Sequence, residues 1–166
     1  MKRMVFALGL AALLTTGCTL RPLYAGGSRG TVAQALRSVT IEPIPGRAGY
    51  LLRGQLVDRL GRQTETPRYR LQIELDDRIT GFGIRLDDAV TRERRTLRAR
   101  YRLVDAELGT VLLDATAGSD AGIDVVGSEY ATVAAEQTAL ERLSEEVAEQ
   151  IVSRIALFVS RSPETP

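Results

Sequence analysis

Three stretches of this chain alternate between apolar and polar residues, and that alternation restricts the possible fold more than any other feature. In Tyr69–Leu75 and in Leu97–Leu103 the odd-numbered residues are apolar and the even-numbered residues are polar. Val111–Ala117, which follows a turn at residues 107–109, also carries apolar residues at its odd positions. Because successive side chains of a strand point to opposite faces, each stretch predicts a strand with one buried and one wet face. Such single-faced alternation is typical of an antiparallel meander.

A shorter alternating segment and a helical segment precede these strands. Val39–Glu42 alternates in the same way, and Pro43 and Pro45 end the predicted strand because proline cannot donate to a ladder. Residues 50–60 repeat leucine every four residues and are followed by Gly61. This spacing predicts an amphipathic helix that ends at the glycine.

A long amphipathic helix is predicted at the end of the chain, from about residue 128 to about residue 159. Ser128 is the predicted N-cap, with Glu129 in the first turn. Its apolar residues advance by threes and fours: Val133, Leu140, Leu143, Val147, Ile151, Ile155 and Phe158. Its other face is acidic and carries Glu136, Glu141, Glu145, Glu146 and Glu149.

These elements predict an α+β fold in the order β-α-β-β-β-α. Helices with one apolar stripe must bury it, and the apolar face of the sheet is the surface available for this. We therefore predict a two-layer sandwich, in which a mostly antiparallel four-stranded sheet carries two helices on one face. The opposite face of the sheet is left uncovered.

The N-terminal residues predict export. Two basic residues, Lys2 and Arg3, precede the apolar run Met4–Leu14. This run is shorter than the stretch of about 20 residues that a membrane-spanning helix needs. A basic start, a short apolar run and small residues are the parts of a secretory signal. A buried N-terminal helix is disfavoured because the run has no polar face, and we predict a signal peptide over residues 1–17.

Cys18, the only cysteine in the chain, follows this run. Thr15–Cys18 resembles the lipobox of bacterial lipoproteins, although Thr15 stands where leucine is common. The resemblance implies cleavage before Cys18 and lipid on its sulfur and its new amino group. Several acyl chains anchor a protein stably, whereas one does so only marginally. The next residue, Thr19, is not the aspartate that retains enteric lipoproteins at the inner membrane, which favours the outer membrane.

The remaining chain is predicted to hold one domain. Removal of the signal leaves about 150 residues, an ordinary size for a single domain. Residues 18–31 are rich in Gly, Ser and Thr and contain a proline, so they are interpreted as a lipidated tether. Residues 32–160 form the predicted α+β domain, and residues 161–166 form a C-terminal tail.

The composition argues against several function classes. Lys and Arg number 22 against 21 Asp and Glu, a net charge of +1, which gives no bulk attraction to nucleic acid. The chain has no histidine, and its one cysteine is predicted to be lipidated, so no usual nucleophile–base pair is available. The adjacent acids Asp76, Asp77, Asp87 and Asp88 are predicted to be turn residues rather than metal ligands. We predict neither an enzyme nor a metal site, and no cofactor apart from covalent lipid on Cys18.

A group of arginines shares one face of the strand around residues 97–103. This set comprises Arg92, Arg94, Arg98, Arg100 and Arg102, and it lies opposite Leu97, Ala99 and Tyr101. The acids on the neighbouring strand 69–76 are too few to pair with all five, and surplus forked donors suit phosphate or carboxylate groups. The alternative is a solvated face with cross-strand ion pairs, each contributing about 0.2–1 kcal/mol. Both interpretations stay open, and the five arginines are our candidate contacts for an anionic ligand or a polar partner surface.

Several segments resemble the LptE family of lipopolysaccharide-assembly lipoproteins. Cys18–Tyr24 is similar to the family's C-G-F-x-P-L-Y start, with Thr19 and Leu20 replacing Gly and Phe. The other similar segments follow in the order of the proteobacterial branch: Leu52–Leu60, Thr91 to Leu103, and Ser128–Gln137, where Glu129 replaces a common proline.

The resemblance implies a sheet with two helices on one side and a function in the outer membrane. Members of the family sit in the lumen of the LptD β-barrel, plug it, help it to assemble and bind lipopolysaccharide during delivery to the outer leaflet. The resemblance therefore implies a lipid-anchored protein that faces the periplasm and the barrel lumen. It identifies no individual lipopolysaccharide-contacting residue.

Two alternatives from other classes stay open at this stage. One is a stand-alone, periplasm-facing lipoprotein that binds an anionic ligand without a barrel partner. The other is a cell-wall hydrolase, which would need a carboxylate pair in a cleft with one raised pKa.

Overall fold

The computed structural model describes residues 27–161, except residues 63, 85–89 and 126. The described elements follow one another along the chain as η1 (Gly27–Arg29), α2 (Thr31–Arg37), β1 (Val39–Ile41), α3 (Gly46–Leu60), β2 (Tyr69–Ile84), β3 (Val90–Asp105), β4 (Val111–Asp124) and α4 (Glu129–Arg161). The predicted signal peptide, Cys18 and most of the predicted tether lie outside the described residues.

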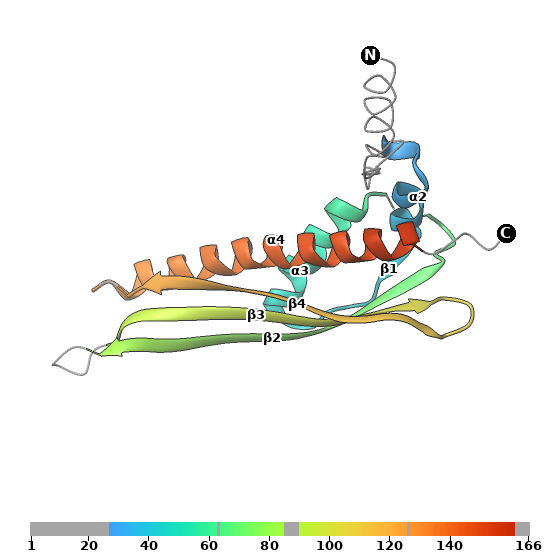
Figure 1. Ribbon diagram of the computed structural model, residues 1–166. Helices are drawn as coiled ribbons and strands as arrows, with labels where there is room; N and C mark the ends of the chain where they lie inside the picture. Colours follow the sequence, from blue (N-terminus) through green and yellow to red (C-terminus); the bar gives the residue numbers. More distant parts are fainter. Residues whose placement is uncertain (1–26, 63, 85–89, 126, 162–166) are drawn as a thin grey trace, which may run out of the picture.

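The strands form one four-stranded sheet in the order β1-β2-β3-β4. β2 pairs antiparallel with β3, and β3 pairs antiparallel with β4. β1 pairs parallel with β2, so the sheet is mixed. This parallel pair follows from α3, which carries the chain back across the sheet between the two strands. Figure 1 shows α3 and α4 on the same side of the sheet, which confirms the predicted two-layer α+β sandwich.

One α-helix in the structure was absent from the sequence prediction. α2 spans seven residues and buries only Val32 and Leu36. Two apolar residues four apart are too few to establish a helical period, so the sequence pattern did not reveal it. η1 and the first residue of α2 fall in the segment interpreted as a tether. α3 begins at Gly46, four residues before its predicted start.

β2 is longer than predicted, and this overturns one interpretation. The strand continues through Gly81 to Ile84 and keeps one register with β3, although Gly83 has a φ of +76°. Asp76 and Asp77 therefore lie within the strand, and their interpretation as turn residues was wrong. Asp77 occupies a position of the apolar face, which made the alternation appear to end there. Asp87 and Asp88 lie outside the described residues.

The predicted turn after β3 is confirmed. The carboxylate of Asp105 accepts hydrogen bonds from the N–H groups of Leu108 at 2.8 Å and Glu107 at 2.9 Å. The bond from Leu108 is the main cause of a pKa of Asp105 below its usual value. Gly109 has a φ of +70°, a conformation that glycine adopts without a Cβ penalty.

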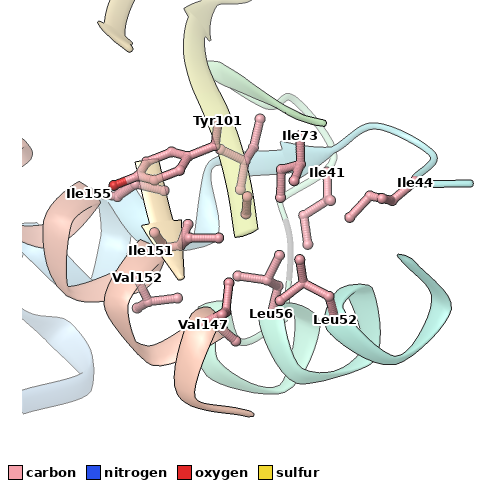
Figure 2. Close-up of a cluster of buried hydrophobic side chains, with 14 of the residues drawn as sticks. Ile41, Ile44, Leu52, Leu56, Ile73, Tyr101, Val147, Ile151, Val152 and Ile155 are labelled. Carbon is pink, nitrogen blue, oxygen red and sulfur yellow. The ribbon is translucent and has the colours of Figure 1, made fainter. Parts of the chain in front are cut away.

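The core lies between the helices and the sheet. Figure 2 shows Leu52 and Leu56 of α3 converging with Val147 and Ile151 of α4 beneath the strands. Tyr101 lies in the same cluster and is 2% exposed. The hydroxyl of Ser144, a buried polar residue of α4, donates to the carbonyl of Leu140 at 2.8 Å, so it carries no unsatisfied donor into the core.

The apolar stripe of α4 is buried only in part. Its members from Leu140 to Ile155 are almost fully buried, whereas Val133 is 44% exposed and Tyr130, on the same first turns, is 87% exposed. The start of α4 therefore presents apolar side chains to solvent at the end of the sheet where β4 finishes (Figure 1). Among the described residues, none of the helices is both long enough and apolar enough to cross a bilayer.

Candidate interaction surface

The side of the sheet away from the helices carries a dense set of charged and polar side chains, which we call the ionic sheet face. β3 contributes the five predicted arginines and Thr96. β2 contributes Gln72, Glu74, Asp76, Arg78 and Thr80, and β4 contributes Asp114, Thr116, Asp120 and Asp124. The shared orientation of the five arginines is confirmed, because the alternating Leu97, Ala99 and Tyr101 are at most 2% exposed on the helix side.

Four of the five arginines are paired with carboxylates. The pairs, with their N–O distances, are Arg92–Asp124 at 3.1 Å, Arg98–Asp120 at 3.2 Å, Arg100–Asp114 at 2.9 Å and Arg102–Glu74 at 3.2 Å. The predicted shortage of acids on β2 is confirmed, since among the described residues only Glu74 of that strand pairs with one of the five arginines. The surplus of unpaired arginines inferred from this shortage was nevertheless too large. Three of the carboxylates belong to β4, and two of those lie beyond residue 117, where that strand was predicted to end.

Two of these pairs lower the pKa of their carboxylates. The hydrogen bond from Arg100 lowers the pKa of Asp114, and the same bond raises the pKa of Arg100. The pKa of Asp120 is lowered first by the hydroxyl of Thr96 and then by Arg98. A lowered pKa in the folded state means that these bonds are present at neutral pH and are lost as pH falls through the lowered pKa. The bonds of Asp114 and Asp120 to the arginines of β3 are therefore formed at neutral pH.

Arg94 differs from the other four arginines. Among the described residues, no carboxylate lies within ion-pair distance of its guanidinium. Its guanidinium carbon instead lies 5.4 Å from the centre of the Phe82 ring, which is 40% exposed. Stacking on an aromatic ring leaves the charge and the outward N–H donors available. The capacity of this face to bind an additional anion is therefore concentrated at Arg94.

The sequence analysis missed an ion pair on the helix side of the sheet. Nε and Nη2 of Arg95 contact the two carboxylate oxygens of Asp77 at 2.9 and 2.6 Å, and Nη1 donates to the carbonyl of Glu136 at 2.9 Å. The side chains of Arg95 and Asp77 are only 12% and 24% exposed. This pair ties β2, β3 and the first part of α4 together. The sequence feature that could have indicated this pair is that both residues are odd-numbered, which places both side chains on the helix side of the sheet.

The Asp77→Asn substitution is expected to lower the free energy of unfolding by about 1–3 kcal/mol. Asparagine has nearly the same shape, but it leaves the half-buried guanidinium of Arg95 without its counter-charge. Denaturant unfolding measures the effect. Asp76→Asn is the matched control, because Asp76 is 52% exposed and pairs only with the exposed Arg78. Its expected effect is within about 0.5 kcal/mol, and equal effects of the two variants would contradict the structural role of Asp77.

Together, the fold and the ionic sheet face define a class of protein: a small two-layer α+β module that leaves one sheet face open and lines it with charged groups. Residues 36–155 match the family described as LptE, lipopolysaccharide-assembly. The chain belongs to this family.

Other proteins are similar to this chain in sequence or in fold. A candidate lipoprotein from Caulobacter crescentus has a solved structure that is 27% identical in sequence, with a TM-score of 0.66 over 79% of this chain and 97% of that one. The uncharacterized protein RP188 of Rickettsia prowazekii is 26% identical over 148 residues, which are 89% of this chain and 92% of that one. The rare lipoprotein B of Shewanella oneidensis shares the fold, with 8% identity and a TM-score of 0.57 over 72% of this chain and 92% of that one.

Proposed function

We propose that this protein is an outer-membrane lipoprotein, anchored by lipid on Cys18, that plugs the LptD β-barrel and helps it to assemble. In this role it binds lipopolysaccharide during delivery to the outer leaflet, without catalytic chemistry of its own. The observation that carries the proposal is the family match over residues 36–155.

The ionic sheet face supports a position inside a barrel lumen. A lumen wall is polar, so a plug that contacts it must present hydrogen-bonding groups rather than apolar side chains. From residue 92 to 102 of β3 and from residue 114 to 124 of β4, the outward residues are arginine, aspartate, threonine and glycine, which satisfy this requirement. β2 and β3 have 16 residues each, which corresponds to about 50 Å of strand. This length exceeds the apolar band of such barrels, about 25 Å tall.

The arginines of the face provide the test. A triple change of Arg94, Arg98 and Arg100 to glutamine is expected to cut co-purification of the barrel, or lipopolysaccharide binding, by at least about tenfold, because desolvated charge partners at an interface contribute about 2–5 kcal/mol each. The binding that remains should depend less on salt. The thermal transition of the free protein should hardly move, since surface changes cost within about 0.5 kcal/mol each.

Arg53→Gln, an exposed arginine of α3 on the other layer, is the matched control and should bind as the parent does. If the triple variant binds both partners like the parent, the face is only a solvated lattice of ion pairs. Purification of the parent from native membranes without overexpression tests the partner itself: recovery without any large barrel protein would contradict the proposed plug.

A further inference from the structure

β2 has a long edge that no described strand or side chain covers. β1 pairs only with Tyr69, Arg70 and Leu71. The N–H of Tyr69 donates to Ser38 and the carbonyl of Leu71 accepts from Glu42, both at 3.0 Å, so the odd-numbered residues direct their backbone groups to this edge. Backbone direction alternates along a strand, so residues 73, 75, 77, 79 and 81 expose N–H and C=O groups there. No described residue bonds to them.

At the opposite edge of the sheet, α4 bonds to the backbone of one residue of β4. Gln150 accepts a hydrogen bond from the N–H of Gly118 at 3.1 Å and donates to the carbonyl of the same residue at 3.3 Å. The next residue of β4, Ser119, donates its hydroxyl to Glu146 of the same helix. Natural proteins guard exposed edges because free backbone groups recruit other strands. Over residues 73–81 of β2 no such bond from a described residue is present, so this edge is available to a strand of another chain.

We propose that the open edge of β2 pairs antiparallel with the same edge of a second copy, about a two-fold axis at Asp77. In this register Asp76 lies opposite Arg78 of the second copy, and the symmetry repeats the pair. On the helix side, Leu75 lies opposite Ile79 of the second copy, whose exposed fraction in the single chain is 42%. Pairing over residues 73–81 forms about ten backbone hydrogen bonds. Gly83, whose φ is +76°, lies beyond this segment.

The charges of β2 select this register over its neighbours. Only the odd-numbered residues direct their backbone groups to the open edge. Each of them must therefore lie opposite an odd-numbered residue of the second copy, so the two-fold axis can shift along the strand in steps of one residue. A shift of the axis to residue 76 places Asp76 opposite Asp76 of the second copy, and a shift to residue 78 places Arg78 opposite Arg78 of the second copy. Like charges directly opposite each other destabilise a strand pair, whereas opposite charges stabilise it. In the proposed register the two Asp77 side chains meet, but each is already neutralised by its own Arg95.

Cysteine pairing tests the register directly. In the full chain with Cys18→Ser, each variant Glu74→Cys or Thr80→Cys carries a single thiol. The proposed register places residue 74 of one copy opposite residue 80 of the other, in a pair with Cα atoms about 4.5 Å apart, a distance that a disulfide spans. Two residues 74, or two residues 80, lie about 20 Å apart. Under oxidation, the equimolar mixture is expected to form at least about ten times more disulfide dimer than either variant alone.

A proline variant separates edge pairing from random collision. Ile79→Pro removes an N–H that points to the open edge and leaves the bonds between β2 and β3 in place, so it should reduce the mixed disulfide at least about fivefold. Ile79→Ala keeps the N–H and should cross-link like the parent. Absence of the mixed disulfide, or equal cross-linking in all combinations, would overturn the proposal. The outcome does not depend on a barrel partner, because only this chain is present in the assay.

Discussion

Replacing Gly49 with alanine is expected to destabilise the protein by about 1–3 kcal/mol. Gly49 is a buried position of α3, and a Cβ placed there would lie 2.6 Å from the carbonyl oxygen of Ile44 and 2.8 Å from its Cγ2. The obstacle is mainly backbone, and Ile44 is held between Pro43 and Pro45, so α3 must move away from the sheet. This cost exceeds the gain of about 1 kcal/mol that alanine normally brings to a helix interior. The midpoint of denaturant unfolding measures it.

Gly54→Ala in the same helix is the matched control. A Cβ at Gly54 meets nothing within 4 Å, so only the helix propensity changes. The expected result is a gain of about 1 kcal/mol in the free energy of unfolding. If both variants were stabilised alike, the close packing of α3 against the segment after β1 would be wrong.

Replacing Cys18 with alanine is expected to move almost all of the protein from the membrane fraction to the soluble fraction. The physical reason is the loss of the acyl chains, because several chains are what make anchoring stable. Fractionation of cells that express each variant measures the distribution. Mass spectrometry of the parent should show an N-terminus at Cys18 that carries lipid.

Thr19→Ala is the control for Cys18, because it changes the next residue and keeps the thiol. It should remain in the membrane fraction. A parent protein with an unmodified thiol, or one cleaved at another position, would refute the predicted anchor.

The sequence by itself determined the order of the four strands and the two longer helices, and the two faces of the sheet. Apolar residues recur with a period of two in Leu97–Leu103 and with a period near 3.6 in the last helix. These periods identify strands and helices because burial of one face of an element imposes its spacing on the apolar residues. The same parity placed the five arginines of β3 on one face and opposite Tyr101. The family resemblance could also be recognised from short segments of the sequence, and the match over residues 36–155 confirms it.

Only the tertiary structure decided which residues become neighbours. The odd or even position of a residue in a strand predicts the side of the sheet on which its side chain lies. It does not predict which strand lies beside it or in which register the two strands pair. For this reason the aspartates of β4 that pair with the arginines, and the Asp77–Arg95 pair beneath α4, were not foreseen. The parallel pairing of β1 and the open edge of β2 likewise depend on how the chain crosses back over the sheet. Such contacts join residues far apart in sequence, and no local periodicity records them.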